Sequence, residues 1–403
     1  MKSWRISLLK DPAPVRIWPG KYPWPVHAAG LSPLTLGGRY ISQSTMESFV
    51  PSALDTQLRR WPTPKPGDFI ITDFTFGTGE RLPELHLHYQ TLGTLRTTTS
   101  DDGRTTTNAV LIMHGTGGSS ENFFNDDFAG QLFNAGQLLD ASRYFIILRD
   151  GIGHGHSSKP SNTGLRARFP RYTYEDMIRA DHQLLTQHLG VAHLRLALGT
   201  SMGGMHTWLL GGTYPGVVDA LMPLASLPAP ITGRNRMWRK MVIDAICADP
   251  SYRDGEYATD KPPLAGLTTA ASIMLLMVSA PLRLQHQGPT RDAADRWLEE
   301  QIAIRVSAMD ANDLIYALEA SREYDPRPGL SRINVPLVAV NSADDEVNPP
   351  ELGILEGEMK SRMKEGLGKA VVLPISEDTR GHSSHTIAVL WKEYLEELLD
   401  KTA

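Results

Sequence analysis

Residues 199–204 read Gly-Thr-Ser-Met-Gly-Gly, and they stand between an apolar run and a stretch of helical character. This is a G-x-S-x-G pattern in the setting that gives it meaning: a strand, a sharp turn and a helix. Such a turn strains the backbone of Ser201, and only small neighbours such as Gly199 and Gly203 tolerate it. The pattern therefore predicts an exposed Ser201 at the positive end of the following helix, as a candidate nucleophile. An ordinary turn is the alternative.

Buried apolar segments alternate with helical segments around this motif. Alternation of this kind is typical of a parallel sheet covered by helices on both faces. The candidate strands are residues 109–113, 144–148, 194–198, 220–224, 336–340 and 370–373. Two earlier segments, 69–76 and 84–90, alternate with period two and suit antiparallel strands at the sheet edge. Residues 174–189 have apolar positions on one helical face and predict a helix that opens with a capping box of Thr173 and Asp176. The predicted fold class is α/β, with a mostly parallel central sheet flanked by helices.

The length of 403 residues suits one large α/β domain with an insertion. Residues 1–66 are rich in Pro and Trp and are predicted to be an irregular N-terminal arm. The core is assigned to residues 67–227 and 334–403. Residues 228–333 form an insertion of helical pattern, with helices predicted at 236–248, 268–278, 291–307 and 312–322. We expect this insertion to lie over the edge of the sheet as a lid.

The composition excludes several functions. A net charge of −5 offers no electrostatic basis for binding nucleic acid. The single cysteine, Cys247, excludes an internal disulfide and is expected in the core. No cofactor is expected, because the glycine-rich loop at 114–118 lacks the Lys and Ser/Thr of a phosphate-binding loop. No metal is expected either, because the pairs His86/His88 and His154/His156 have no carboxylate or third histidine near them in sequence. No membrane span or signal peptide is recognised, so a cytoplasmic location is expected.

A nucleophilic serine needs a base and an acid that orients the base. Asp344 and Asp345 both follow the strand at 336–340, and the spacing to Pro349 favours Asp345. His382 and His385 both lie in the loop before the last helix, and His382, which follows a glycine, is favoured as the base. The order serine, acid, histidine is the order of a hydrolytic triad on an α/β sheet.

Attack on a carbonyl also needs donors for the developing oxyanion. The N–H groups of Met202 and Thr116 are the candidates, because Met202 follows the serine and Thr116 lies in the glycine-rich loop. Ile273, Met274 and Met277 are candidate lining residues of an acyl or alcohol pocket. Packing inside the lid is the alternative for these three.

With these residues placed, the chain resembles the homoserine O-acetyltransferase-like branch of the α/β-hydrolase fold. The likeness covers about residues 68 to 398, and it rests on the stretches at 87–93, 108–115, 169–177, 201–205, 345–350 and 381–382. The resemblance implies an α/β-hydrolase fold, a triad of Ser201, Asp345 and His382, and a helical lid above a narrow tunnel.

The chain departs from this branch in the first lid helix. In the homoserine-using acyltransferases an arginine just before Ala-Ile-x-x-Asp-Pro grips the carboxylate, and here that motif at 245–250 places Ile243 there. An aliphatic side chain cannot replace such a clamp. Arg236 or Arg239, from a neighbouring turn, is the alternative for this role, but both are interpreted as surface charges. Thr200 and the His-Gly-Thr-Gly-Gly loop are likewise closer to esterases.

The sequence therefore favours a serine hydrolase that cleaves a carboxylic ester, on a small-molecule ester or acyl substrate, through an acyl-enzyme. The alternative is an O-acyltransferase that moves an acetyl or other acyl group from acyl-CoA to a hydroxyl acceptor. A ligand receptor that retains the fold is a third, non-enzymatic interpretation. Exposed lid helices also make a homodimer an expectation.

Overall fold

The computed structural model describes residues 61–99, 101, 103 and 105–402. Residues 1–60 of the predicted arm therefore lie outside the described residues. Residues 65 and 66, which the sequence predicts to be part of the arm, begin the first strand.

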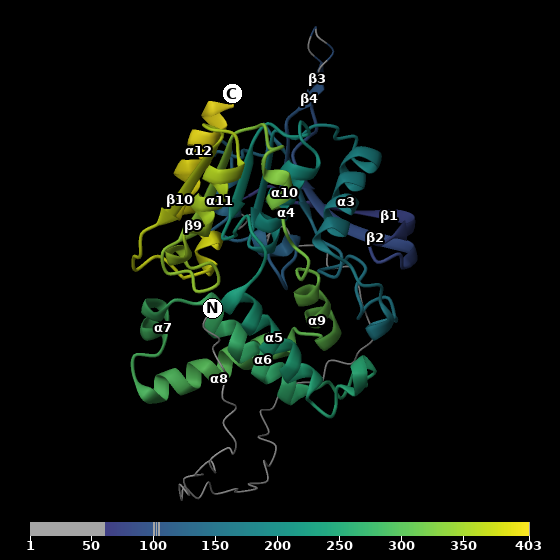
Figure 1. Ribbon diagram of the computed structural model, residues 1–403, viewed down its shortest axis with the longest axis vertical. Helices are drawn as coiled ribbons and strands as arrows, with labels where there is room; N and C mark the ends of the chain where they lie inside the picture. Colours follow the sequence, from purple (N-terminus) through teal and green to yellow (C-terminus); the bar gives the residue numbers. More distant parts are fainter. Residues whose placement is uncertain (1–60, 100, 102, 104, 403) are drawn as a thin grey trace, which may run out of the picture. The chain divides into compact units, whose positions relative to one another are not determined.

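An eight-stranded sheet forms the centre of the described chain (Figure 1). In spatial order its strands are β1 (Lys65–Thr75), β2 (Arg81–Leu92), β6 (Phe145–Arg149), β5 (Ala109–Met113), β7 (Leu196–Thr200), β8 (Leu221–Leu224), β9 (Leu337–Ser342) and β10 (Gly368–Leu373). The pairs from β6 to β10 are parallel, whereas β1–β2 and β2–β6 are antiparallel. This arrangement confirms the predicted fold class and the antiparallel strands at one edge.

The strand predicted at 194–198 is β7, and it begins two residues later than predicted. Leu194 makes only an isolated bridge with Val218, and the regular ladder starts at Leu196. A short separate hairpin of β3 (Thr97–Thr99) and β4 (Thr105–Thr107) precedes β5.

Successive residues of the central strands face two different apolar clusters, because side chains alternate across a sheet. In β5, Leu111 and Met113 belong to one cluster, and Val110 and Ile112 belong to the other. The first face is covered by α3 (Tyr174–Gln183), α4 (Met202–Thr213), α10 (Arg327–Leu330) and α11 (Ile354–Arg362). The second is covered by α2 (Ala129–Leu132) and α12 (Lys392–Lys401). A sheet buried on both sides explains the continuous apolar runs of its strands.

Helix α3 begins with the predicted capping box. The Thr173 hydroxyl accepts from the N–H of Asp176, and the Asp176 carboxylate accepts from the N–H of Thr173. The helix was expected to run to Leu189, but its α-helical part ends at Gln183. A wider π-helical turn over Leu184–His188 follows.

Helices α5 (Gly233–Cys247), α6 (Leu264–Val278), α7 (Pro281–Gln287), α8 (Arg291–Ser307) and α9 (Ala311–Glu319) lie between β8 and β9 in the chain. They gather at one end of the sheet (Figure 1). Their own apolar core includes Trp238, Val242, Leu267 and Leu314. The four helical segments expected here are present, and α7 is an addition. The role of this insertion as a lid, and its limits at 228 and 333, stay predictions.

The end of α5 corrects one expectation, since Cys247 is exposed rather than part of the core. In the described part of the chain, no single helix is long and apolar enough to cross a membrane. The bent pair of α6 and α7, which meet at 117°, reaches the required length and composition only when taken together.

Candidate active site

Ser201 occupies the turn between β7 and α4. Its φ of 54° and ψ of −110° lie in a region that costs a non-glycine residue of the order of 1–3 kcal/mol. The glycines beside it are required by close packing: a Cβ on Gly199 would lie 1.9 Å from the carbonyl oxygen of Gly203. A Cβ on Gly203 would lie 2.0 Å from the carbonyl oxygen of Met113. The sequence pattern thus produces the strained turn that it predicts.

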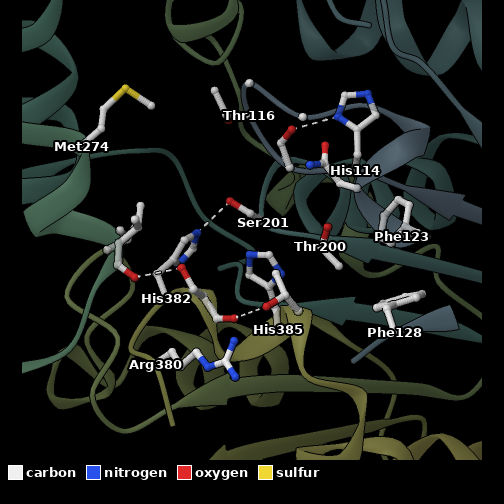
Figure 2. A pocket seen from close by; sticks show the side chains of 18 of the residues that line it. His114, Thr116, Phe123, Phe128, Thr200, Ser201, Met274, Arg380, His382 and His385 are labelled. Atoms are coloured by element: carbon white, nitrogen blue, oxygen red, sulfur yellow. Dashed lines mark hydrogen bonds between the residues drawn. The ribbon is translucent and has the colours of Figure 1, made fainter. Parts of the chain in front are cut away.

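The structure brings Ser201 together with His382 and Asp345 (Figure 2 shows the serine and the histidine). The hydroxyl Oγ of Ser201 lies 2.7 Å from Nε2 of His382, and Nδ1 of His382 lies 2.8 Å from Oδ2 of Asp345. Burial alone would raise the pKa of Asp345, but the charge and hydrogen bond of His382 and two backbone N–H groups bring it below its usual value. An ionised carboxylate therefore faces the imidazole.

Asp344, the other candidate acid, has a different position. Its carboxylate accepts hydrogen bonds from the Ser342 hydroxyl, from the Thr379 hydroxyl at 2.8 Å and from the N–H of Gly381 at 3.2 Å. Asp344 therefore ties the loop that carries His382 to the end of β9.

His385, the other candidate base, packs its ring edge-to-face against the ring of His382, with the centroids 5.5 Å apart. Burial lowers the pKa of His385 to about 3, so its ring is neutral at ordinary pH. His382, and not His385, lies at hydrogen-bond distance from Ser201.

The glycine-rich loop after β5 lies directly against the serine. A Cβ on Gly115 would be 3.3 Å from the Cβ of Ser201, and Thr116 lines the cavity in front of the serine (Figure 2). Met202 is the buried first residue of α4. Both predicted oxyanion donors therefore belong to segments that adjoin Ser201.

His114 anchors this loop. Its Nδ1 lies 2.8 Å from the carbonyl oxygen of Gly115, and its Nε2 lies 3.0 Å from the N–H of Gly151. These partners require a neutral ring that donates from Nδ1 and accepts at Nε2. Burial and the nearby Arg149 guanidinium hold the pKa of His114 well below its usual value, which is consistent with that neutral form.

A cavity of about 590 Å³ opens in front of Ser201. Its walls come from the glycine-rich loop, the loop of His382, and helices α5, α6 and α8. Of the three predicted pocket residues, Met274 lines it. Ile273 and Met277 are not among its lining residues, and all three side chains pack against the apolar core of the insertion.

Arg239 also lines this cavity, which corrects its interpretation as a surface charge. Its side chain is only 2% exposed. The guanidinium donates to the Asn235 side-chain oxygen at 3.0 Å and to the Ser321 hydroxyl at 3.3 Å, and it lies over the ring of Trp238. Within the part of the chain that the structure describes, no carboxylate forms an ion pair with it.

The spacing of α5 contained a signal for this. Arg239, Val242 and Ile246 are three and four residues apart, and Val242 and Ile246 are fully buried. They therefore share the inner face of the helix. Ile243 and Arg236 instead line a separate groove, which also contains Met237 and Cys247. In that groove Arg236 is paired with Glu319.

Over the described residues, no group of three or more His, Cys, Asp or Glu side chains is arranged to hold a metal ion. The groups available for chemistry at this cavity are a serine hydroxyl hydrogen-bonded to an imidazole, adjacent backbone N–H groups and the buried guanidinium of Arg239.

Residues 108–358 match the model of the α/β hydrolase fold family. The homoserine O-acetyltransferase of Haemophilus influenzae (strain 86-028NP) is 30% identical over 313 residues, which are 70% of this chain and 84% of that protein. The chain therefore belongs to the α/β-hydrolase fold family, in its homoserine O-acetyltransferase-like branch. It is an enzyme of that superfamily.

Solved structures support the same fold. The crystal structure of esterase E22 aligns with a TM-score of 0.72 at 20% identity, over 84% of this chain and 100% of that one. The homoserine O-acetyltransferase from Bacillus anthracis aligns with a TM-score of 0.71 at 20% identity, over 84% of this chain and 98% of that one.

Proposed function

We propose that the chain is an O-acyltransferase. In this proposal Ser201 carries an acyl group from a thioester donor such as acetyl-CoA to the hydroxyl of a small acceptor that bears a carboxylate. Two observations support it. Two relatives that match more than two thirds of the chain are named homoserine O-acetyltransferases. The cavity in front of Ser201 contains a buried guanidinium.

In the first half of the reaction Ser201 attacks the donor carbonyl. Nε2 of His382 takes the hydroxyl proton as the Oγ–carbon bond forms, and Asp345 holds the ring through Nδ1. The tetrahedral intermediate then breaks its carbon–sulfur bond. The thiolate leaves with the proton from His382, and the acyl group stays on Ser201.

In the second half the acceptor hydroxyl enters the site that the thiol has left. His382 takes its proton while the acceptor oxygen attacks the acyl carbon. The bond to Oγ breaks, and the proton returns to Ser201. In both halves the N–H groups of Met202 and Thr116 would donate to the oxyanion, and the loss of one such donor typically costs on the order of 100- to 1000-fold in rate.

The buried guanidinium of Arg239 is the observation that supports an acceptor with a carboxylate. A guanidinium that is buried without a carboxylate partner is costly, and an anion from the substrate would offset that cost. The planar group can bind a carboxylate through two parallel hydrogen bonds. Burial lowers the pKa of Arg239, but an arginine stays protonated in proteins. The residue lies four positions, about one helical turn, before Ile243.

Covalent labelling tests the proposal. Wild-type protein and Ser201→Ala are mixed with acetyl-CoA, and the covalent mass is followed before and after addition of L-homoserine. We expect one acetyl group on the wild type only, and its fast release as O-acetylhomoserine. Absence of a Ser201-dependent label with both acetyl-CoA and p-nitrophenyl acetate would overturn the enzymatic assignment.

Ester hydrolysis is the second candidate, and the position of Ile243 favours it. This residue stands where the branch has its carboxylate-binding arginine, and it lies in the separate groove rather than in the cavity. In that case water would release the acyl group. The same experiment separates the two functions, because a hydrolase would lose its label at the same rate with or without the acceptor.

A further inference from the structure

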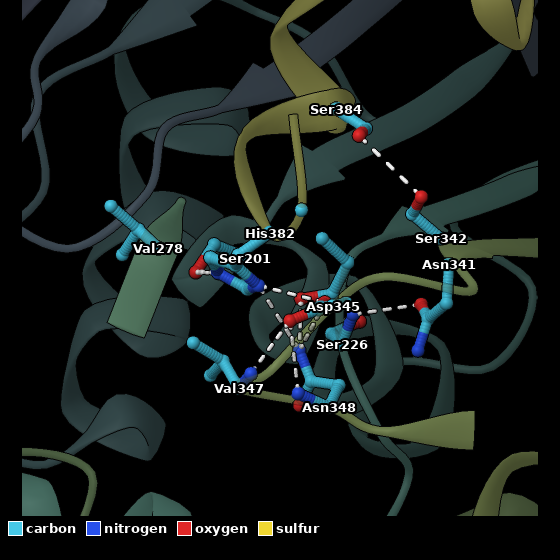
Figure 3. Close-up of polar contacts among 12 residues, drawn as sticks. Ser201, Ser226, Val278, Asn341, Ser342, Asp345, Val347, Asn348, His382 and Ser384 are labelled. Carbon is cyan, nitrogen blue, oxygen red and sulfur yellow. Dashed lines mark hydrogen bonds and ion pairs between the residues drawn. The ribbon is translucent and has the colours of Figure 1, made fainter. Parts of the chain in front are cut away.

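The carboxylate of Asp345 receives more hydrogen bonds than the one from His382 (Figure 3). Its Oδ1 accepts from the N–H groups of Val347 at 2.8 Å and of Asn348 at 3.0 Å. Its Oδ2, the oxygen that faces His382, also accepts from the side-chain amide of Asn348 at 3.2 Å. Two donors therefore share one oxygen of the acid.

A second hydrogen bond fixes the side chain of Asn348, and through it the position of Oδ2 of Asp345. The amide nitrogen is 2.9 Å from the carbonyl oxygen of Ala225. Ala225 follows Leu224, whose carbonyl accepts the N–H of Ser201 at 2.9 Å. Asn348 is only 1% exposed, so its amide does not exchange these partners for water. The acid is thus held relative to the turn of Ser201 by a path that does not pass through His382.

The shared oxygen also has an electrostatic consequence. A hydrogen bond from Asn348 stabilises the ionised form of Asp345 and makes Oδ2 a weaker acceptor for His382. A weaker acceptor stabilises the protonated imidazole less. The same amide nitrogen lies 3.4 Å from Nδ1 of His382, where its hydrogens also disfavour a positive charge on the ring. Loss of the Asn348 amide should therefore make His382 easier to protonate.

Other charged and titratable groups around His382 come from several elements. His385 packs against its ring and is neutral at ordinary pH. Arg380 stands two residues before it and pairs with Asp127, and Asp344 accepts from Gly381. Arg239 and Arg305 line the same cavity. Among the described residues, the hydrogen bonds to Oδ2 of Asp345 come from His382 and Asn348.

We propose that Asn348 is a positioning residue that holds Oδ2 of Asp345 in front of His382 and limits how readily His382 takes up a proton. The inference rests on the proposed function for its catalytic meaning, since it is His382 that must be neutral to accept the proton of Ser201. An imidazole that is protonated too easily is inactive over more of the physiological pH range.

The test measures protonation of His382 directly, by ¹⁵N-histidine NMR titration of the full chain, with the signal assigned through His382→Gln. Asn348→Leu keeps the branched shape of the side chain and removes its hydrogen bonds to Asp345 and Ala225, together with its contact to Nδ1 of His382. Asn348→Ser is the second variant, in case leucine prevents folding. Asn341→Ser is the matched control. Asn341 is a buried asparagine whose oxygen accepts from the N–H of Ser226 at 3.1 Å, and no hydrogen bond joins it to Asp345 among the described residues.

We expect the titration midpoint of His382 to rise by roughly half a pH unit in the Asn348 variants and to stay in place in the control. The acidic side of the pH profile for the acetylation of Ser201 by p-nitrophenyl acetate should shift to higher pH by the same amount. The KM should not change. An unchanged midpoint in folded Asn348 variants, or an equal rise in Asn341→Ser, would overturn the inference. The NMR measurement needs no activity, so an unlabelled Ser201 would count against the proposed function alone.

Discussion

At the scale of single residues, burial separates side chains that look alike in the sequence. Arg239 and Lys240 are adjacent cations on α5, but Arg239 points inward while Lys240 is exposed and pairs with Asp244 one turn later. Asp344 and Asp345 are adjacent acids, and only Asp345 faces His382. Within each pair, the direction of the side chain decides its role.

Replacing Arg239 by methionine should impair acceptor binding and leave acylation of Ser201 intact. A hydrogen bond to a charged group contributes about 1.5–3 kcal/mol, so KM for L-homoserine should rise about 10- to 100-fold. The rate of acetylation by p-nitrophenyl acetate should change little, because this donor has no carboxylate. Steady-state kinetics with both substrates check the split.

Lys240→Met is the matched control for Arg239→Met, and it should leave both parameters as in the wild type. An equal loss of acetylation and of acceptor use in Arg239→Met would point instead to a structural role of Arg239 in α5.

At the scale of elements, the candidate site depends on loops that follow neighbouring strands. β7, β8 and β9 are adjacent and parallel, so the turn of Ser201 and the loop of Asp345 begin at the same edge of the sheet. Asp344 joins the loop after β9 to the loop after β10, which carries His382. Helix α6 adds a further contact, since the Ser383 hydroxyl donates to the carbonyl oxygen of Val278.

Replacing Asp344 by alanine should therefore displace His382, although Asp344 itself does not contact the substrate. A misplacement of about 1 Å can cost about 100-fold in rate, so we expect a loss of 10- to 100-fold in the rate at which a fluorophosphonate probe labels Ser201. Asp378→Ala, an exposed change in the same loop, should label at the wild-type rate. Equal rates for both variants would contradict the role given to Asp344.

At the scale of the whole molecule, several histidines are buried in the neutral state. Burial holds the pKa values of His114 and His206 well below the usual range, lowers that of His154 to about 4 and lowers that of His385 to about 3. In the unfolded chain a histidine takes up a proton near pH 6.5. Below that pH the unfolded state binds protons that the folded state cannot, so folding stability is lost as the pH falls.

The free energy of unfolding should therefore fall between pH 6.5 and pH 4, by roughly 1 kcal/mol for each buried histidine at one pH unit below 6.5. Urea unfolding at pH 7.5 and pH 5.5 measures the difference. His385→Phe should reduce this difference, and a change at the exposed His86 to glutamine should not. A urea midpoint that is the same at both pH values would show that the buried histidines do not govern acid stability.

The local pattern of the chain was sufficient to predict the alternation of strands and helices, the turn of Ser201 and the capping box of α3. Each of these depends on neighbours within a few residues: glycines beside a strained serine, apolar runs of strand length, and a threonine three residues before an aspartate. The order of serine, acid and histidine, each after its own strand, also depends on chain order alone. For this reason Ser201, Asp345 and His382 could be selected before their distances were known.

The tertiary structure decided what burial and long-range contacts control. The inward position of Arg239, the placement of Met274 rather than Ile273 on the cavity wall, and the exposure of Cys247 depend on how the insertion packs. Asn348 owes its role to a carbonyl oxygen 123 positions away in the chain. Local sequence carries no information about partners at such separations, because they meet only when the sheet has assembled.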